Sequence, residues 1–313
     1  MICSTIIATV DRSTLSRAVN SVIDQGFPEE DVEVIVVNDS GKPLVPGGWQ
    51  ESNLVTIIST QRRERSIARN TGAAIARGRY LHFLDDDDWL LPGALEALWG
   101  LSNQSQKEWL YGCTQLIDRQ GRELIQLEHG LRGNCFTKIM AGEWIPLQSS
   151  FIRSDLFFQI GGFSPSLSGP EDIDLCRRFA LHGEFDYTSQ IVACVEMGSA
   201  KSTTDYAFSL VAARTSRESI LDQPDVFKRL RGSAQSNVLD GRIVRIYLTS
   251  TFWNIKHHNL LKAIIRMAYA TFSFLISGRS VLKLSYWRAI SKPYTSDTFL
   301  QGFQAAGLPV SRR

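Results

Sequence analysis

Hydrophobic residues in the first ninety positions alternate between two spacings. Runs of strand length, rich in valine, isoleucine and leucine, cover residues 2–10, 32–40, 54–59 and 79–84. Between these runs, apolar positions recur at helical spacing in residues 15–26 and 65–78, and each helical stretch closes at a glycine. Strands that alternate with helices in this way predict a parallel sheet. The nearly continuous apolar run at 32–40 is typical of a strand that is buried on both faces.

The alternation weakens after Pro92, which opens another helix. The pattern then predicts strands at 109–118, 123–128, 148–153 and 185–196, with helical segments at 155–160 and 172–182 and an irregular stretch at 129–146. From about residue 199 the pattern is helical without clear strands. We therefore predict an α/β domain at 1–198 and a helical region at 199–313.

Polar residues follow three of the predicted strands. Thr9 and Asp11 come after the first strand, Asn38 and Asp39 end the second, and Asp85 begins a polar cluster after the fourth. Ligands of parallel α/β sheets bind beyond the carboxyl ends of the strands. The three clusters are therefore expected to meet at one edge of the sheet and to form a binding site there.

Composition and cysteine usage indicate an ordinary folded protein in a reducing compartment. Hydrophobic residues make up 43% of the chain and charged residues 21%. The five cysteines form no CxxC pair, and their odd number argues against a closed disulfide framework. The first apolar run is cut by Asp11 and is too short for a signal peptide, and no uninterrupted apolar run reaches 18 residues. We expect a cytoplasmic location.

The net charge of +2 hides an uneven distribution along the chain. Between Phe227 and Arg313 there are 14 lysines and arginines but only two acids, Asp240 and Asp297. Residues 252–287 mix these bases with aromatic and aliphatic side chains, a composition suited to a helix at an anionic membrane surface. A helical bundle packed on the first domain, with its bases in water, is the alternative. The charge of this tail makes peripheral attachment to the membrane our hypothesis.

The most informative stretch is RYLHFLDDDDWLLPGALEAL, in which a hydrophobic strand delivers four aspartates to its carboxyl end. Adjacent carboxylates repel one another and raise each other's pKa unless a cation neutralises them. Mg²⁺ and Mn²⁺ prefer such oxygen ligands, and Mg²⁺ commonly combines one or two carboxylates with substrate phosphates. A solvated acidic turn that caps the next helix is the alternative, although the strand before and the Pro92 helix after it favour the metal site.

This passage, FLDDDDWLLP, resembles the FLDxDDxxxP motif of the large inverting glycosyltransferase family with the GT-A fold, often called family 2. STIIATVDR, VEVIVVNDSG and RSIARNTGAAIARGRYLHFLD match further motifs in the family's order, and the resemblance covers about residues 2–196. It implies a Rossmann-like, mostly parallel sheet flanked by helices, here with a helical C-terminal extension. It also implies a nucleotide-diphosphate sugar as donor and a divalent metal, Mg²⁺ or Mn²⁺, as cofactor.

The resemblance assigns the metal motif to Asp85 and Asp87. Asp87 is the direct ligand in this assignment, Asp86 and Asp88 flank the pair, and Asp85 and Asp86 also belong to the donor site. Four consecutive acids leave the register open by one residue.

Five further residues are implied at the nucleotide. They are Thr9 and Asp11 in the first loop, Asp39 at the base or ribose, and Arg69 and Asn70 on the helix before the metal motif. Three of them have a structural alternative. Asp39 and Asp11 are suited to capping a turn and a helix start, and Arg69 is suited to a surface ion pair with Glu64 or Asp85.

A second acidic site is indicated by GPEDIDLCRRF, where Glu171 and Asp172 begin a helix. Ordinary helix capping is the alternative. The stretch is similar to the family's path from a serine-rich strand through GGF to an ED dyad, in which Asp172 is the general base and Glu171 orients the site. Transfer to a hydroxyl requires such a base, because the proton must be accepted as the new bond forms. Asp174 and Arg178 are expected to form a structural ion pair at i,i+4 spacing.

Several other possibilities remain open on the sequence alone. Arg62, Arg63 and Arg65 are either a solvated run or contacts to donor phosphates. A haloacid-dehalogenase-type phosphotransferase is the rival enzyme class, although Trp89 and three preceding strands do not fit its motif. A nucleotidyltransferase would have a glycine-rich first loop, which ATVDRSTLSRA lacks. A nucleotide-binding module without turnover is the non-enzymatic alternative, and no motif supports nucleic-acid binding. The resemblance instead favours transfer to a glycan or lipid-linked acceptor in cell-surface glycan or polysaccharide synthesis.

Overall fold

The computed structural model describes residues 1–61, 64–118, 120–167, 169–196 and 206–292. Within these residues, one sheet contains the strands β1 (Cys3–Thr9), β2 (Val32–Asn38), β3 (Val55–Ser59), β4 (Tyr80–Phe83), β5 (Trp89–Leu90), β6 (Trp109–Ile117), β7 (Glu123–Leu127), β8 (Ser150–Arg153) and β9 (Phe185–Glu196). Their order is β3-β2-β1-β4-β8-β6-β9-β5, and β7 pairs with β6. The sheet is flanked by the helices α1 (Leu15–Ile23), α2 (Arg65–Ile75), α3 (Ala94–Gln104), α4 (Phe136–Ala141), α5 (Ser154–Gln159) and α6 (Glu171–His182).

The first four strands in this order are parallel, and they align their carboxyl ends. β1 pairs with β2 from Cys3 opposite Val32 to Thr9 opposite Asn38, and β4 lies on the other side of β1. Every residue of β2 is buried, as its apolar run predicted. Beyond β4 the sheet becomes mixed, because β8 runs antiparallel to both β4 and β6.

Successive residues of the central strands enter two cores on opposite faces of the sheet. Ile6 packs into the core that contains side chains of α2, α4, α5 and α6, whereas Ile7 packs into the core formed with α1 and α3. Gly72 lets α2 lie close to β1, because a Cβ atom there would come within 2.6 Å of the Ile6 Cγ2 atom. The predicted α/β architecture is therefore confirmed for this part of the chain.

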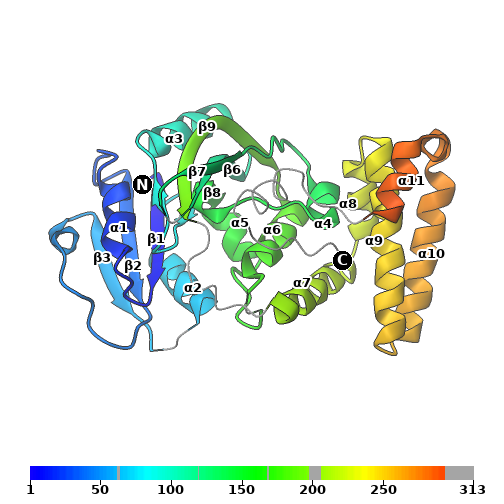
Figure 1. Ribbon diagram of the computed structural model, residues 1–313, viewed down its shortest axis with the longest axis horizontal. Coiled ribbons are helices and arrows are strands. Elements are labelled where there is room, and N and C mark those ends of the chain that lie inside the picture. Colours follow the sequence, from blue (N-terminus) through cyan, green and yellow to red (C-terminus); the bar gives the residue numbers. More distant parts are fainter. Residues whose placement is uncertain (62–63, 119, 168, 197–205, 293–313) are drawn as a thin grey trace.

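The described C-terminal part is helical, with α7 (Tyr206–Leu221), α8 (Val226–Ser233), α9 (Asn237–Lys256), α10 (Leu260–Ile276) and α11 (Leu284–Ser291). Figure 1 shows α8 to α11 gathered at one end of the molecule, beyond α4, with α9 and α10 as a long antiparallel pair. The predicted boundary near residue 198 lies outside the described residues. Among the helices of the described ranges, none combines the length and apolarity needed to cross a bilayer.

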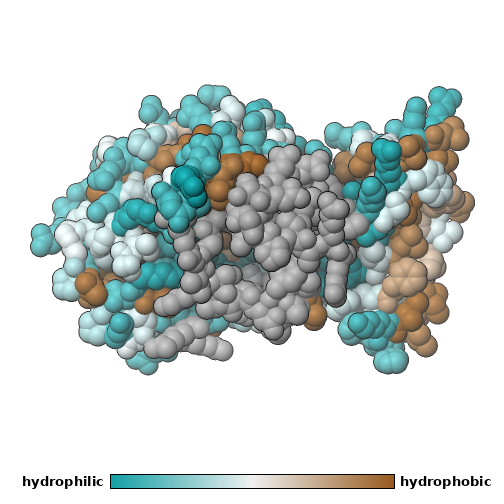
Figure 2. Space-filling model, viewed as in Figure 1, coloured by the Kyte–Doolittle hydropathy of each residue, from teal (hydrophilic) through white to brown (hydrophobic). Residues whose placement is uncertain are grey.

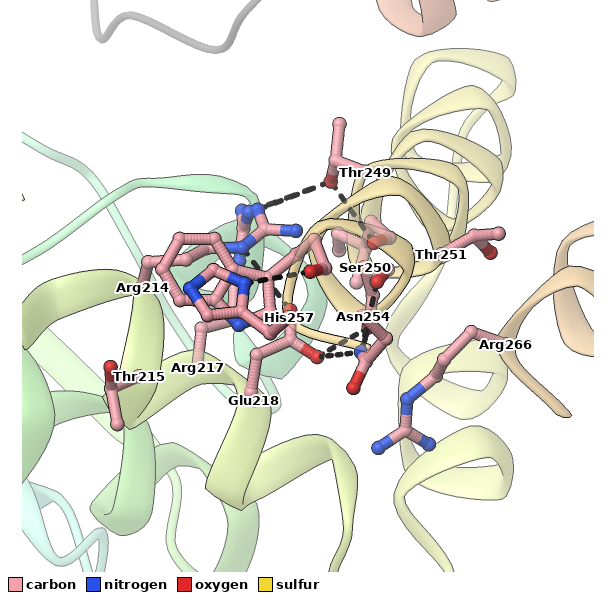
Figure 3. A network of polar contacts seen from close by, with 12 residues as sticks. Arg214, Thr215, Arg217, Glu218, Thr249, Ser250, Thr251, Asn254, His257 and Arg266 are labelled. Carbon is pink, nitrogen blue, oxygen red and sulfur yellow. Dashed lines mark hydrogen bonds and ion pairs between the residues drawn. The ribbon is translucent and has the colours of Figure 1, made fainter. Parts of the chain in front are cut away.

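Polar contacts fasten these helices to the α/β part. Asp174 pairs with Arg178 at 2.7 Å, as predicted, and also accepts a hydrogen bond from Ser216 of α7. Glu218 of α7 in turn accepts hydrogen bonds from Ser250 and from Asn254 of α9 (Figure 3). Asp174 thus links α6 to α7, and Glu218 links α7 to α9.

The structure corrects two local predictions. Residues 129–146 are not wholly irregular, because Phe136–Ala141 forms α4, whose Thr137 hydroxyl donates to the carbonyl oxygen of Leu230 at 2.7 Å. The predicted strand at 148–153 begins at Ser150, because Leu147–Ser149 is a 3₁₀ turn. The cysteines behave as expected: all five are buried free thiols.

Candidate active site

The polar residues predicted to meet at one sheet edge do meet there. The Thr9 hydroxyl donates to the Oδ2 atom of Asp86 at 2.5 Å, and the Asp39 N–H donates to the Thr9 carbonyl oxygen at 2.8 Å. These contacts join the ends of β1, β2 and β4, which are neighbours in the sheet. Parallel pairing therefore assembles residues that lie far apart in the chain.

The four consecutive aspartates point in two directions. Carboxylate oxygens of Asp85, Asp87 and Asp88 all lie within 4.8 Å of one another. Asp86 turns away from this cluster, and its buried carboxylate accepts hydrogen bonds from Thr9 and Arg12 instead. Both residues of the predicted metal pair, Asp85 and Asp87, thus belong to the cluster, and Asp88 is its third member.

The cluster carries more negative charge than its own surroundings compensate. Burial and the charges of Asp85 and Asp87 raise the pKa of Asp88 well above its usual value. Burial and Asp85 also raise the pKa of Asp87. Asp85 differs: burial opposes its ionisation, but the neighbouring Arg69 guanidinium outweighs that effect and lowers its pKa. A cation held by all three carboxylates would favour the ionised form of each.

Gln148 bridges this cluster, although the sequence analysis gave it no role. Its side-chain N–H₂ donates to Asp85 Oδ2 at 3.1 Å and to Asp88 Oδ2 at 2.8 Å. The backbone of Gln148 is held in turn, because its carbonyl oxygen lies 2.9 Å from the Nε2 atom of His82. Burial lowers the pKa of His82 to about 4, so the imidazole is neutral and donates one hydrogen bond. The sequence offered no signal for Gln148 beyond its place as a polar residue at the start of the predicted strand 148–153.

Arg69 connects the aspartate cluster to the second acidic site, Glu171 and Asp172. It lies on α2, whose N-terminus is capped by the side chain of Glu64. Its guanidinium is only 5% exposed and hydrogen-bonds both Asp85 and Glu171, the latter at 3.0 Å. Arg69 is therefore a buried bridge, and of its predicted alternatives the pair with Asp85 is present.

Glu171 and Asp172 stand at the start of α6, as predicted. Glu171 Oε1 accepts hydrogen bonds from Arg69 and from Arg65 Nε, the latter at 2.7 Å. Its buried Oε2 has no hydrogen-bond partner among the described residues. Burial and the adjacent Asp172 raise the pKa of Glu171 to about 7, against the opposing charge of Arg69.

Asp172 is half-buried and lies at the same edge as the cluster. Its Oδ1 accepts the N–H of Ile173 at 2.7 Å. Burial raises the pKa of Asp172. The charge of Arg69 lowers this pKa, and the charge of Asp85 raises it. The two acidic sites are therefore neighbours that share Arg69.

The remaining predicted residues lie around this edge with their own partners. Asp39 accepts hydrogen bonds from the Thr60 hydroxyl at 2.6 Å and from the Glu64 N–H at 2.7 Å. Asp11 adopts a left-handed backbone with φ of +66° and accepts the Val45 N–H at 3.2 Å. Asp39 thus caps a turn, as its structural alternative proposed, whereas Asp11 contacts a loop and does not cap the helix start, because the N-cap residue of α1 is Thr14.

Asn70 exchanges hydrogen bonds with the backbone of Phe163. Its Nδ2 donates to the carbonyl oxygen at 2.8 Å, and its Oδ1 accepts the N–H at 2.9 Å. Gly162, with φ of +64°, is required beside it, because a Cβ atom would lie 2.7 Å from that oxygen. Asn70 therefore holds the GGF loop against α2. Of the predicted arginine run, Arg65 reaches Glu171, whereas Arg62 and Arg63 lie outside the described residues.

Arg12 is a second residue that the sequence analysis missed. Its guanidinium hydrogen-bonds Asp86 and lies 3.2 Å from the Oδ2 atom of Asp87. Arg17 lies nearby and donates to the Asp87 carbonyl oxygen at 3.0 Å, with its guanidinium stacked 3.7 Å over the ring of Trp89. Arg12 and Arg17 thus contact Asp86 and Asp87, whereas Arg69 contacts Asp85. The only sequence signal for Arg12 and Arg17 was their place in the loop and helix after β1.

Curated proteins similar to this chain include several named glycosyltransferases. A Campylobacter jejuni GalNAc(5)-diNAcBac-PP-undecaprenol beta-1,3-glucosyltransferase is 30% identical over 125 residues, which cover 38% of this chain and 39% of that protein. The Staphylococcus aureus poly(ribitol-phosphate) beta-N-acetylglucosaminyltransferase TarP is 29% identical over 103 residues, covering 31% and 32%. The chain thus matches less than half the length of these two relatives.

A solved structure shares the fold of most of the chain. Staphylococcus aureus TarS 1-349 in complex with UDP-GlcNAc superposes with a TM-score of 0.59 at 14% identity, over 87% of this chain and 91% of that one. The sequence model of glycosyl transferase family 2 matches residues 4–166, just over half of the chain and the part that carries the aspartate cluster, Arg69 and the GGF loop. By this match, and with a fold that agrees with it, the chain belongs to glycosyl transferase family 2.

Proposed function

We propose that this chain transfers a sugar from a nucleotide-diphosphate donor to an acceptor hydroxyl, with inversion at the anomeric carbon. The observation that carries the proposal is the contact chain from Asp85 through Arg69 to Glu171, with Asp172 beside it. It brings a carboxylate cluster suited to a cation next to a separate carboxylate suited to accepting a proton. The reaction needs both, at adjoining positions.

The aspartate cluster fits a divalent cation. Three carboxylates within 4.8 Å, with the pKa of Asp88 and Asp87 raised, form a hard oxygen donor set of the kind that Mg²⁺ and Mn²⁺ prefer. Asp87 and Asp85 would hold the metal, and Asp88 would assist them. When bound, the ion would supply positive charge to the departing diphosphate, which stabilises the transition state. Gln148 keeps two of these carboxylates in place.

Asp172 is the proposed general base. It is half-buried at the start of α6, and burial raises its pKa toward the range in which a carboxylate accepts a proton effectively. Glu171 orients this position, because Arg65 and Arg69 both fix its Oε1 atom. Base catalysis typically contributes about 10²- to 10⁴-fold.

Five residues are proposed to form the nucleotide side of the site: Thr9, Asp11, Asp39, Arg69 and Asn70. Their internal hydrogen bonds define two roles: Thr9 and Asp39 set the shape of the loops that receive the nucleotide, and Asn70 keeps the GGF loop in place. Asp85 and Asp86 complete the donor side. Two observations support this donor site: its residues lie around one edge of the sheet, and they match the family's motifs.

The proposed acceptor is a glycan or a lipid-linked glycan of the cell surface. The names of the similar proteins support this class, because one acts on an undecaprenol-linked glycan and another on poly(ribitol-phosphate). We propose a cytoplasmic location, in keeping with five buried free thiols. The division into a catalytic domain at 1–198 and a helical region at 199–313 also remains a proposal.

A donor panel tests the function. The full chain is incubated with UDP-, GDP- and dTDP-sugars, with Mg²⁺, with Mn²⁺ and with a chelator, and release of nucleotide diphosphate is measured. We expect release from one donor class that requires the metal. Binding of a donor without release would instead support the nucleotide-binding module. Metal-independent release would contradict the role given to Asp87.

A further inference from the structure

Helix α10 buries its small side chains and exposes its large apolar ones. The buried positions of α10, which packs against α9, are Ala263, Ala270 and Ser273, with Arg266 between them. Leu261, Ile264 and Leu275 are 73%, 67% and 69% exposed. A helix on the surface of a water-soluble domain normally has the opposite pattern, with its large apolar residues turned inward.

The exposed apolar surface continues beyond α10. Figure 2 shows hydrophobic side chains gathered along the outer side of this end of the molecule. Phe252 near the end of α9 is exposed, as are Leu282 and Leu284 after the 3₁₀ turn Gly278–Leu282. We call these three residues, together with the exposed apolar residues of α10, the apolar face. On α10 these are Leu260, Leu261, Ile264, Ile265, Met267, Tyr269, Phe272, Phe274, Leu275 and Ile276. Patches of this extent on a folded domain mark sites of interaction.

The apolar face is bordered by positive charge. From residue 226 to 292 the chain has twelve lysines and arginines and one acid, Asp240, which is paired with Arg231. Lys256 is exposed where α9 leads into α10, and Arg279 and Lys283 are exposed just beyond the other end of α10. Bases therefore stand at both ends of the apolar helix.

We propose that the apolar face docks on the surface of a lipid bilayer that contains anionic lipids. Helix α10 lies along the interface, with its large apolar side chains in the acyl boundary and the bases at its ends among the headgroups. The proposal is independent of sugar transfer, since docking requires neither donor nor metal.

The apolar face is held firmly on the rest of the molecule. Asp222, just after α7, pairs with Arg266 at 2.5 Å and with Lys262 at 2.5 Å. Tyr269 of α10 stacks on Phe227 and Tyr247 with ring centroids 5.0 and 5.1 Å apart. Arg266 is drawn beside the network that ties α7 to α9 (Figure 3). A docked α10 would therefore fix the orientation of the whole chain at the membrane.

Charge favours a bilayer over a second copy of this chain. Two copies joined through the apolar face would bring Lys256, Arg279 and Lys283 of each copy toward the interface. Among residues 226–292 the one acid is Asp240, which is already paired with Arg231, so like charges oppose such an interface. Anionic headgroups would neutralise the same bases.

Flotation of the full chain with vesicles tests the proposal. At low salt, we expect the protein to float with phosphatidylcholine vesicles that contain phosphatidylglycerol and to remain behind with pure phosphatidylcholine. The double variant Ile264→Glu, Leu275→Glu should reduce the bound fraction by at least about tenfold. Both side chains are exposed, so folding should persist, and an unchanged thermal transition checks this. Arg279→Glu with Lys283→Glu should abolish the preference for anionic vesicles.

The matched control is the double variant Ile57→Glu, Ile75→Glu, which adds the same two negative charges at exposed isoleucines of β3 and α2. It should float like the wild-type protein. A wild-type protein that fails to float at low salt would overturn the proposal, as would normal flotation of the Ile264→Glu, Leu275→Glu variant. A lipid-free dimer that this variant dissociates, without vesicle binding by the wild type, would assign the face to a second copy instead. None of these readouts depends on turnover, so failure here is distinguishable from failure of the proposed transferase activity.

Discussion

The sheet edge and the apolar face depart from the usual distribution of side chains in opposite directions. At the sheet edge, charged residues are buried: Asp86, Asp88, Arg69 and Glu171 are all at most 5% exposed. On the apolar face, large hydrophobic residues such as Leu275 are exposed. Folding alone favours neither arrangement, because burying charge and exposing apolar surface both cost free energy.

The difference teaches what kind of partner each region would accept. The buried acids are only partly compensated by Arg12, Arg65 and Arg69, and the pKa of Asp88 is raised, so a small cation would complete that site. Large side chains of the apolar face are exposed in the part of the chain that the structure describes, and the bases at both ends of α10 are positive. One region suits a compact ion with an anionic ligand, and the other suits an extended anionic surface.

Asp172→Asn gives the largest expected effect and separates the two acidic sites. Removing the proton acceptor should lower turnover by about 10²-fold or more, with donor affinity nearly unchanged. The measurements are kcat with a donor and acceptor, and donor affinity by calorimetry. The control is Asp155→Asn, which neutralises an exposed acid in the first turn of α5. Wild-type turnover in Asp172→Asn would show that the base lies elsewhere.

Asp87→Asn and Asp86→Asn test whether adjacent acids really have different partners. Asp87→Asn should raise the half-saturating metal concentration by more than about 100-fold, beyond the effect typical of an outer-sphere partner. Asp86→Asn should leave that concentration within a few-fold, because its carboxylate contacts Thr9 and Arg12. Metal titrations of donor binding measure both. Equal shifts in the two variants would refute the division of the four aspartates.

Gln148→Met sharpens the same comparison by removing only the bridge. The thioether keeps the side-chain volume but cannot donate to Asp85 and Asp88, whose mutual repulsion would then rise. We expect a loss of metal affinity of about tenfold, in the range for outer-sphere partners. A positioning role predicts that high metal concentration restores kcat, whereas an effect on kcat that metal cannot restore would indicate direct contact with substrate.

Elements with a local cause were predictable from the sequence. The β-branched runs of β1 and β2 define their own strands to within one or two residues, and parallel pairing then brings Thr9, Asp39 and Asp85 to one edge. Helix α4 was missed because its six residues are a weak signal alone. Its Thr137 hydrogen-bonds Leu230, which is 93 positions away.

The site follows the same rule. The aspartate run and the ED dyad are visible because each is a contiguous motif. Gln148 and Arg12 were missed because their roles depend on contacts across 60 and 74 positions, which a single sequence does not display. The division of the aspartates, with Asp86 facing away from the cluster, likewise depends on which neighbours the fold supplies.

The smallest expected effect is a pH dependence of the free energy of unfolding, caused by the burial of Glu171. Burial and Asp172 raise its folded-state pKa to about 7, above the unfolded value of 4.5. Between these values the folded state binds more protons than the unfolded state. Stability therefore falls as pH rises through that window, by up to about 1.4 kcal/mol per pH unit. Urea unfolding at pH 5 and pH 7 should show this loss in the wild-type protein and a smaller one in Glu171→Gln. An unchanged pH dependence in the variant would mean that Arg65 and Arg69 keep Glu171 ionised throughout.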